Sequence, residues 1–81
     1  MKTYYVLFPN HMNAIRLKEI LIRRNYRVTI VPTPRELSAS CGISLLICEE
    51  DIDDIKAIIE KERVETLGIA SIEKATGPEK G

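Results

Sequence analysis

Aromatic residues are scarce in this 81-residue sequence, which has no Trp, one Phe and three Tyr. Because 44% of the residues are nevertheless hydrophobic, we expect a core filled by Ile, Leu and Val side chains. The scarcity also removes the stacked aromatic side chains with which proteins hold single-stranded nucleic acids, and Gly-rich basic loops are missing too. We therefore expect no nucleic-acid partner.

Long apolar runs and cysteine pairs are also missing. No stretch approaches the roughly 20 apolar residues that cross a bilayer, and the first residues lack the apolar run and cleavage site of a secretory signal. The two cysteines, Cys41 and Cys48, are too few for the disulfide framework of a small secreted domain. We therefore expect a cytoplasmic protein with free thiols and no membrane contact.

The length allows one core and excludes a large two-lobed active site. We expect residues 1–72 to form a single domain. Residues 73–81 contain Thr-Gly-Pro and no apolar pattern, so we expect a disordered tail there. Nothing in the sequence demands an oligomer, which leaves a monomer or a homodimer.

Charge is balanced overall but not along the chain. Residues 1–35 contain seven basic residues and one acidic residue, whereas residues 36–81 contain five basic and eleven acidic residues. The simplest interpretation is that a basic helix and an acidic helix lie side by side on one face of a sheet. A docking surface for an acidic partner at Arg23, Arg24 and Arg27 is the alternative that this pattern leaves open.

The spacing of apolar residues predicts four strands and two helices in the order β-α-β-β-α-β. The strands are expected at residues 3–8, 27–31, 42–48 and 67–72. The helices are expected at residues 11–25 and 51–63, with Asn10 capping the first, and Asp51 and Asp54 forming a capping box on the second. This order is that of the ferredoxin-like α+β fold, in which an antiparallel four-stranded sheet carries both helices on one face.

The connection between the second and third strands is longer than a hairpin requires, and such loops are often functional. Thr33, Pro34 and Glu36 match a capping box with proline at the first helical position. We therefore expect a short helix over residues 34–40. Such a helix would place Cys41 at the start of the third strand.

Cys41 is the candidate functional thiol. In one interpretation its side chain is partly exposed and is surrounded by groups that could stabilise a thiolate or a persulfide anion, namely Arg35, Ser38, Ser40 and the Gly42 amide. The alternative is that Cys41 packs as a small hydrophobe, because free cysteine is among the most buried residue types. The residues alone leave both open.

The remaining candidate sites have less support. Cys48 follows an apolar run without polar neighbours, so we expect it to be structural. At roughly 3.3 Å per residue, the two cysteines are too far apart along a strand for an easy disulfide, which disfavours a redox sensor. His11 has no second ligand at metal spacing, and the acidic run 49–54 lacks the Gly turn of a calcium loop. We therefore expect no metal and no cofactor.

The run Ile30-Val31-Pro32-Thr33-Pro34-Arg35-Glu36-Leu37-Ser38-Ala39-Ser40-Cys41-Gly42-Ile43-Ser44-Leu45 resembles the signature of a small bacterial and archaeal family, the selenium/sulfur (Se/S) carrier protein-like family. Its pattern is apolar-Pro-x-Pro-Arg-Glu-apolar-Ser-x-x-Cys-Gly, and the resemblance extends more loosely over residues 4–72. Carried over by position, the pattern marks Pro32, Pro34, Arg35, Glu36, Ser38, Cys41 and Gly42. Cys48 lies outside it.

The resemblance implies a carrier rather than a stand-alone enzyme. Cys41 would hold sulfur or selenium as a persulfide or selenopersulfide and relay it between donor and acceptor proteins, with Arg35 offsetting charge, Ser38 and Ser40 donating hydrogen bonds, and Gly42 allowing close approach. The competing hypothesis is a non-catalytic interaction or regulatory module in which Cys41 is structural.

Overall fold

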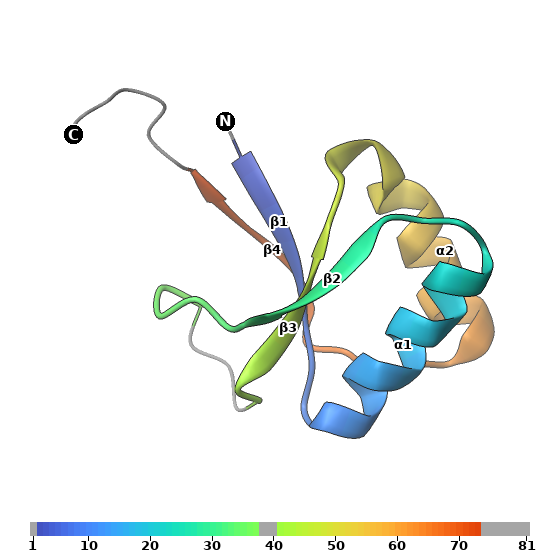
Figure 1. The fold of residues 1–81 in the computed structure, drawn as a ribbon, viewed down its shortest axis with the longest axis horizontal. Coiled ribbons are helices and arrows are strands. Elements are labelled where there is room, and N and C mark those ends of the chain that lie inside the picture. Colours follow the sequence, from blue (N-terminus) through green and yellow to red (C-terminus); the bar gives the residue numbers. More distant parts are fainter. Residues whose placement is uncertain (1, 38–40, 74–81) are drawn as a thin grey trace.

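The elements of the computed structural model follow the predicted order, and the structure describes residues 2–37 and 41–73 (Figure 1). They are β1 Lys2–Leu7, α1 His11–Arg23, β2 Val28–Pro32, β3 Ile43–Ile47, the short 3-10 turn η1 Glu49–Asp51, α2 Ile52–Glu62 and β4 Gly68–Glu73. Every strand begins and ends within one residue of its predicted bounds. β4 includes Glu73, where the tail was expected to begin, and the rest of that tail lies outside the described residues.

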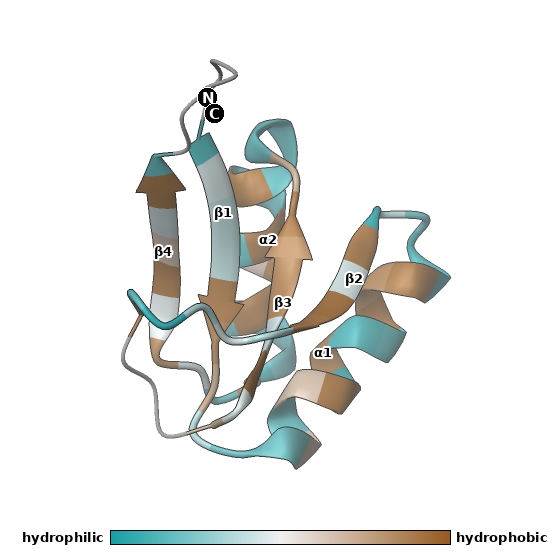
Figure 2. Cartoon of the chain, turned by 60° about the vertical axis from the view of Figure 1, so that its left-hand side comes forward, coloured by the Kyte–Doolittle hydropathy of each residue, from teal (hydrophilic) through white to brown (hydrophobic). Residues whose placement is uncertain are grey.

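The four strands form one antiparallel sheet in the order β2-β3-β1-β4, so β2 and β4 are its edges. Both helices lie on one face of this sheet (Figures 1 and 2). The ferredoxin-like α+β fold is thereby confirmed. None of the helices in the described part of the chain is long and apolar enough to span a membrane.

The main core lies between the sheet and the helices. Side chains alternate between the faces of a strand, so the paired residues Val6 and Leu45 both face the helices, where they are fully buried. Helix spacing brings Leu17 and Leu21 of α1 and Ile55 of α2 against them. The core is therefore almost entirely aliphatic, as the composition predicts.

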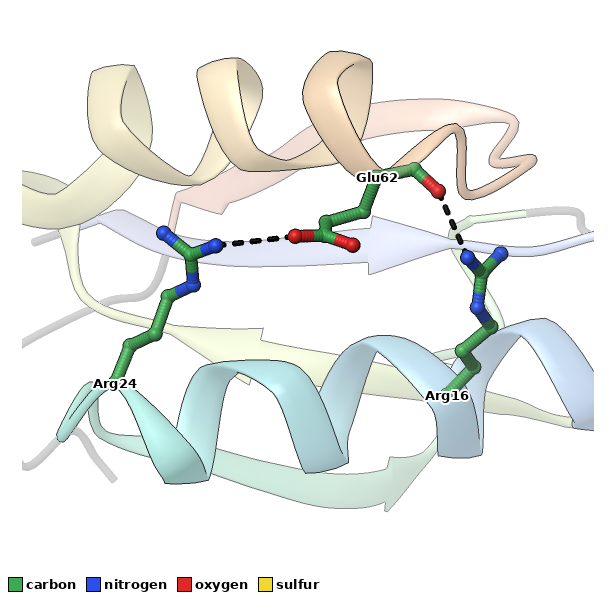
Figure 3. Close-up of polar contacts among 3 residues, drawn as sticks. All are labelled: Arg16, Arg24 and Glu62. Atoms are coloured by element: carbon green, nitrogen blue, oxygen red, sulfur yellow. Dashed lines mark hydrogen bonds and ion pairs between the residues drawn. The ribbon is translucent and has the colours of Figure 1, made fainter.

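The two helices are joined by polar contacts at one carboxyl-terminal residue of α2 (Figure 3). Arg24, just past α1, forms an ion pair with the Glu62 carboxylate at 3.0 Å. Arg16 donates to the main-chain carbonyl of Glu62 at 2.8 Å, which is favourable because helix-end carbonyls lack intrahelical donors. The prediction that a basic and an acidic helix lie side by side is confirmed.

The two helix starts differ in how well the sequence predicts them. Asn10 caps α1 as expected, because its side-chain oxygen accepts from the N–H of Asn13 at 3.0 Å. The prediction that Asp51 and Asp54 form a capping box is wrong. Asp51 has helical backbone angles and makes no capping bond, and Asp54 accepts instead from the Tyr26 hydroxyl at 3.0 Å. The chain enters α2 through η1, which removes the extended cap residue that a capping box requires.

Candidate functional site

Thr33 fixes the two ends of the connection between β2 and β3. The ladder of these strands ends at the pair Pro32 and Ile43, and one step beyond it the Thr33 N–H donates to the Gly42 carbonyl at 2.9 Å. The Thr33 hydroxyl donates to the carbonyl of Cys41 at 3.0 Å. The backbone of Cys41 is therefore held at the mouth of β3, where the sequence predicts it.

The predicted helix over residues 34–40 is wrong for the part that the structure describes. A single turn is closed by the Leu37 N–H and the Pro34 carbonyl at 2.9 Å, and no helix is assigned between Pro34 and Leu37. The physical reason is that the Thr33 hydroxyl, which was expected to cap the helix, is engaged by Cys41. Residues 38–40 lie outside the described residues.

The connection leaves β2 on the side of the sheet opposite the helices (Figures 1 and 2). The register puts Tyr5 and Ser44 on that side, because their neighbours Val6 and Leu45 face the helices. Both residues are nevertheless buried. They are covered on the face of the sheet where the connection lies. The sheet therefore has a second buried layer, on the face away from the helices.

Cys41 is buried, with only 4% of its surface exposed, and its thiol is free. Of the two interpretations that the residues leave open, this burial agrees with the packed thiol and not with the partly exposed one. The core cluster between sheet and helices does not include Cys41. The Thr33 hydroxyl holds the Cys41 carbonyl just past the end of β2.

Ser44 is a residue of this region that the sequence does not single out. It is 0% exposed, and its hydroxyl has no hydrogen-bond partner among the described residues. An unpaired buried hydroxyl carries a desolvation penalty of about 1–3 kcal/mol. The available signal was a polar residue inside the apolar run of β3, three residues after Cys41.

Arg35 and Gly42 are the expected supporting residues that lie within the described part of the chain. Arg35 and Gly42 are exposed, and within the described ranges Arg35 forms no ion pair. Gly42 does not have a left-handed backbone, and a Cβ atom added to it would meet nothing within 4 Å. The fold therefore does not require glycine at this position. Ser38 and Ser40 lie outside the described residues.

Cys48 lies just past the opposite end of β3 from Cys41 and is half-buried. It lines a shallow hollow of about 420 Å³ together with Lys2, Arg27 and Glu49. The expected contrast between the two cysteines is thus reversed, because the predicted reactive thiol is the more buried one. Both thiols are free, so they form no disulfide.

The chain matches the model of a known protein family. No curated protein matches the chain. The model of a protein family described as "Putative Se/S carrier protein-like" matches residues 3–71, which include both helices, β2, β3, the Cys41 connection and most of β1 and β4. The match covers most of the sequence, and it includes the motif that suggested the resemblance. The chain therefore belongs to the Putative Se/S carrier protein-like family.

Proposed function

We propose that this protein carries a sulfur or selenium atom on Cys41 and relays it between a donor protein and an acceptor protein. The observation that carries the proposal is the fixed position of the Cys41 backbone. Thr33 holds the Cys41 backbone at the start of β3, outside the main core. Family membership over residues 3–71 supports the same conclusion.

The transfer step needs no oxidant. The Cys41 thiolate attacks the terminal sulfur of a donor persulfide, so a new sulfur–sulfur bond forms while the donor's own bond breaks. The donor leaves as a thiolate and takes up the proton that Cys41 released. The transferred sulfur keeps its oxidation state, and the reverse attack by an acceptor thiolate unloads the carrier. The same balance holds for selenium.

Two exposed residues of the connection between β2 and β3 fit this step. Arg35 would offset the negative charge of a persulfide, and it is available because it forms no ion pair within the described residues. Gly42 would allow a donor backbone to approach closely, and the fold has no other need for a glycine there. Ser38 and Ser40 remain predicted hydrogen-bond donors to the persulfide.

The 4% exposure of Cys41 favours a second candidate function. In this alternative the protein is a non-catalytic interaction or regulatory module, and Cys41 packs without chemistry. Alkylation of the native protein would then be slow at Cys41, and Cys41→Ala would leave partner binding intact.

Incubation with a cysteine desulfurase and cysteine, followed by intact-mass measurement, tests the carrier. We expect a sulfur adduct on the wild-type protein and on Cys48→Ser, and none on Cys41→Ser. Absence of the adduct from the wild type, or its persistence on Cys41→Ser, would exclude the carrier and leave the interaction module.

A further inference from the structure

The outer edge of β2 is an unpaired strand edge. In the described part of the chain, β2 bonds to β3 on one side and to no strand on the other. Thr33 donates to Gly42 and thus turns toward β3, so the antiparallel alternation turns the N–H and C=O groups of Val28 and Ile30 outward. Pro32 also faces outward, where its missing N–H removes nothing from the ladder.

One flank of α1 lies along this edge. α1 contacts β2 and β3, and Arg16 of α1 bonds to α2 on one flank of the helix (Figure 3). The other flank of α1 therefore faces the outer side of β2 (Figure 2). Ile15, Lys18 and Ile22 stand on that flank at the spacing i, i+3, i+7. Ile15 and Ile22 are 44% and 50% exposed, and Ile30 of β2 is 37% exposed.

We call Ile15, Lys18, Ile22, Val28 and Ile30 the β2-edge surface. It combines a strip of apolar side chains with free backbone donors and acceptors. Those two features suit an extended polypeptide, which adds to an open sheet edge through main-chain hydrogen bonds and places alternate side chains in the flanking groove. The exposed isoleucines do not favour the binding of a nucleic acid.

The charge around the β2-edge surface determines which polypeptide fits. Lys18, Arg23 and Arg27 form no ion pairs within the described ranges, in contrast to Arg24, which is neutralised by Glu62. Glu19 is the one acidic residue among residues 1–35. A second copy that paired through its own β2 would bring like charges together, because a two-fold interface is self-complementary. An acidic segment would instead meet opposite charge.

We propose that the β2-edge surface docks an extended acidic segment of a partner protein. The segment would bear alternating acidic and apolar residues and would lie beside β2, which continues into the Thr33 contact with Cys41. The identification of that partner as a donor or acceptor of the transfer rests on the function proposed above. The docking itself does not.

The test titrates the isotope-labelled full chain with a short peptide in which Glu and Val alternate. NMR shifts should be confined to residues 28–32 and to α1, and exchange of the Val28 and Ile30 amide protons should slow. Ile22→Glu should weaken binding by about tenfold or more. Leu67→Glu is the matched control, because Leu67 is 52% exposed beside the opposite sheet edge, and it should leave binding unchanged.

Four results would overturn the docking proposal: no binding, equal binding of a Lys-Val peptide, the same shifts with an oligonucleotide, or concentration-dependent dimerisation through β2. The link to transfer has its own readout. Excess peptide should slow loading of Cys41 by a donor protein but not by inorganic polysulfide. If the peptide binds without slowing the donor, the transfer partner does not use this surface. If no sulfur is ever loaded while the peptide binds, the carrier function fails and the docking site stands.

Discussion

At the scale of single residues, Thr33 determines the geometry of the site. Its N–H and hydroxyl bind two successive carbonyls, those of Gly42 and Cys41, across a loop of eight positions. A β-branched residue suits the continuation of a strand, and the hydroxyl adds a bond that valine could not make. The local sequence predicts Thr33 as a helix cap because a long-range partner is invisible to a local pattern.

Replacing Thr33 by Val removes this hydroxyl and keeps the side-chain shape. We expect Thr33→Val to lower the free energy of unfolding by about 1 kcal/mol, the usual contribution of one hydrogen bond. Alkylation of Cys41 should also become faster, because its carbonyl loses a tether. Thr29→Val is the control, since Thr29 is exposed on the same strand and makes no side-chain bond among the described residues. Equal unfolding midpoints in urea for the two variants would contradict this role.

Removal of the Ser44 hydroxyl should change the free energy of unfolding in the opposite direction. Ser44→Ala removes a buried hydroxyl that has no partner, so we expect the free energy of unfolding to rise by about 1 kcal/mol. Ser71→Ala, an exposed change in β4, corrects for strand propensity. Urea unfolding of both variants measures the difference. A loss of stability in Ser44→Ala relative to Ser71→Ala would mean that the hydroxyl is satisfied in solution.

At the scale of elements, the strands are well predicted because their signals are local. Alternation of side chains, together with the flanking Pro, Gly and charged residues, indicates each strand to within one residue. The failures fall where a side chain has a distant partner. Asp54 does not cap α2 because it binds Tyr26, which follows α1. The residues alone leave the burial of Cys41 open, because burial depends on the path of the connection relative to the sheet.

The Tyr26 contact between the two helical segments predicts a pH dependence. Its hydrogen bond to Asp54 raises the pKa of the Tyr26 hydroxyl, and desolvation and the charges of Asp54 and Asp51 act in the same direction. A pKa raised by folding stabilises the protein below the unfolded tyrosine pKa of about 10, and this contribution is lost as the pH rises through the folded value.

We therefore expect the free energy of unfolding to be higher for the wild type than for Tyr26→Phe. This difference should be constant below a pH of about 10 and should shrink above it. Denaturant unfolding across this pH range measures the difference. Asp54→Ala removes the accepting carboxylate, which is the largest cause of the shift, and should remove most of the alkaline decline. A difference that grows with pH would contradict the assignment.

At the scale of the whole molecule, the parts of the chain have separate tasks. The helices cover one face of the sheet and are joined by the contacts of Arg24 and Arg16 with Glu62. The connection from β2 occupies the opposite side and carries Cys41, while Cys48 lies at the far end of β3. This separation makes the two thiols distinguishable. Accessibility favours reaction at Cys48, whereas the proposed function requires Cys41.

Mapping of the transferred sulfur to one cysteine tests the central claim most directly. The native protein is incubated with a cysteine desulfurase and cysteine, digested under conditions that preserve persulfides, and analysed by peptide mass spectrometry. Inorganic polysulfide, a donor that needs no docking, serves as the comparison and should load the more accessible Cys48 first. The account predicts that sulfur from the protein donor resides on the Cys41 peptide. Its appearance on the Cys48 peptide, or on neither, would contradict the account.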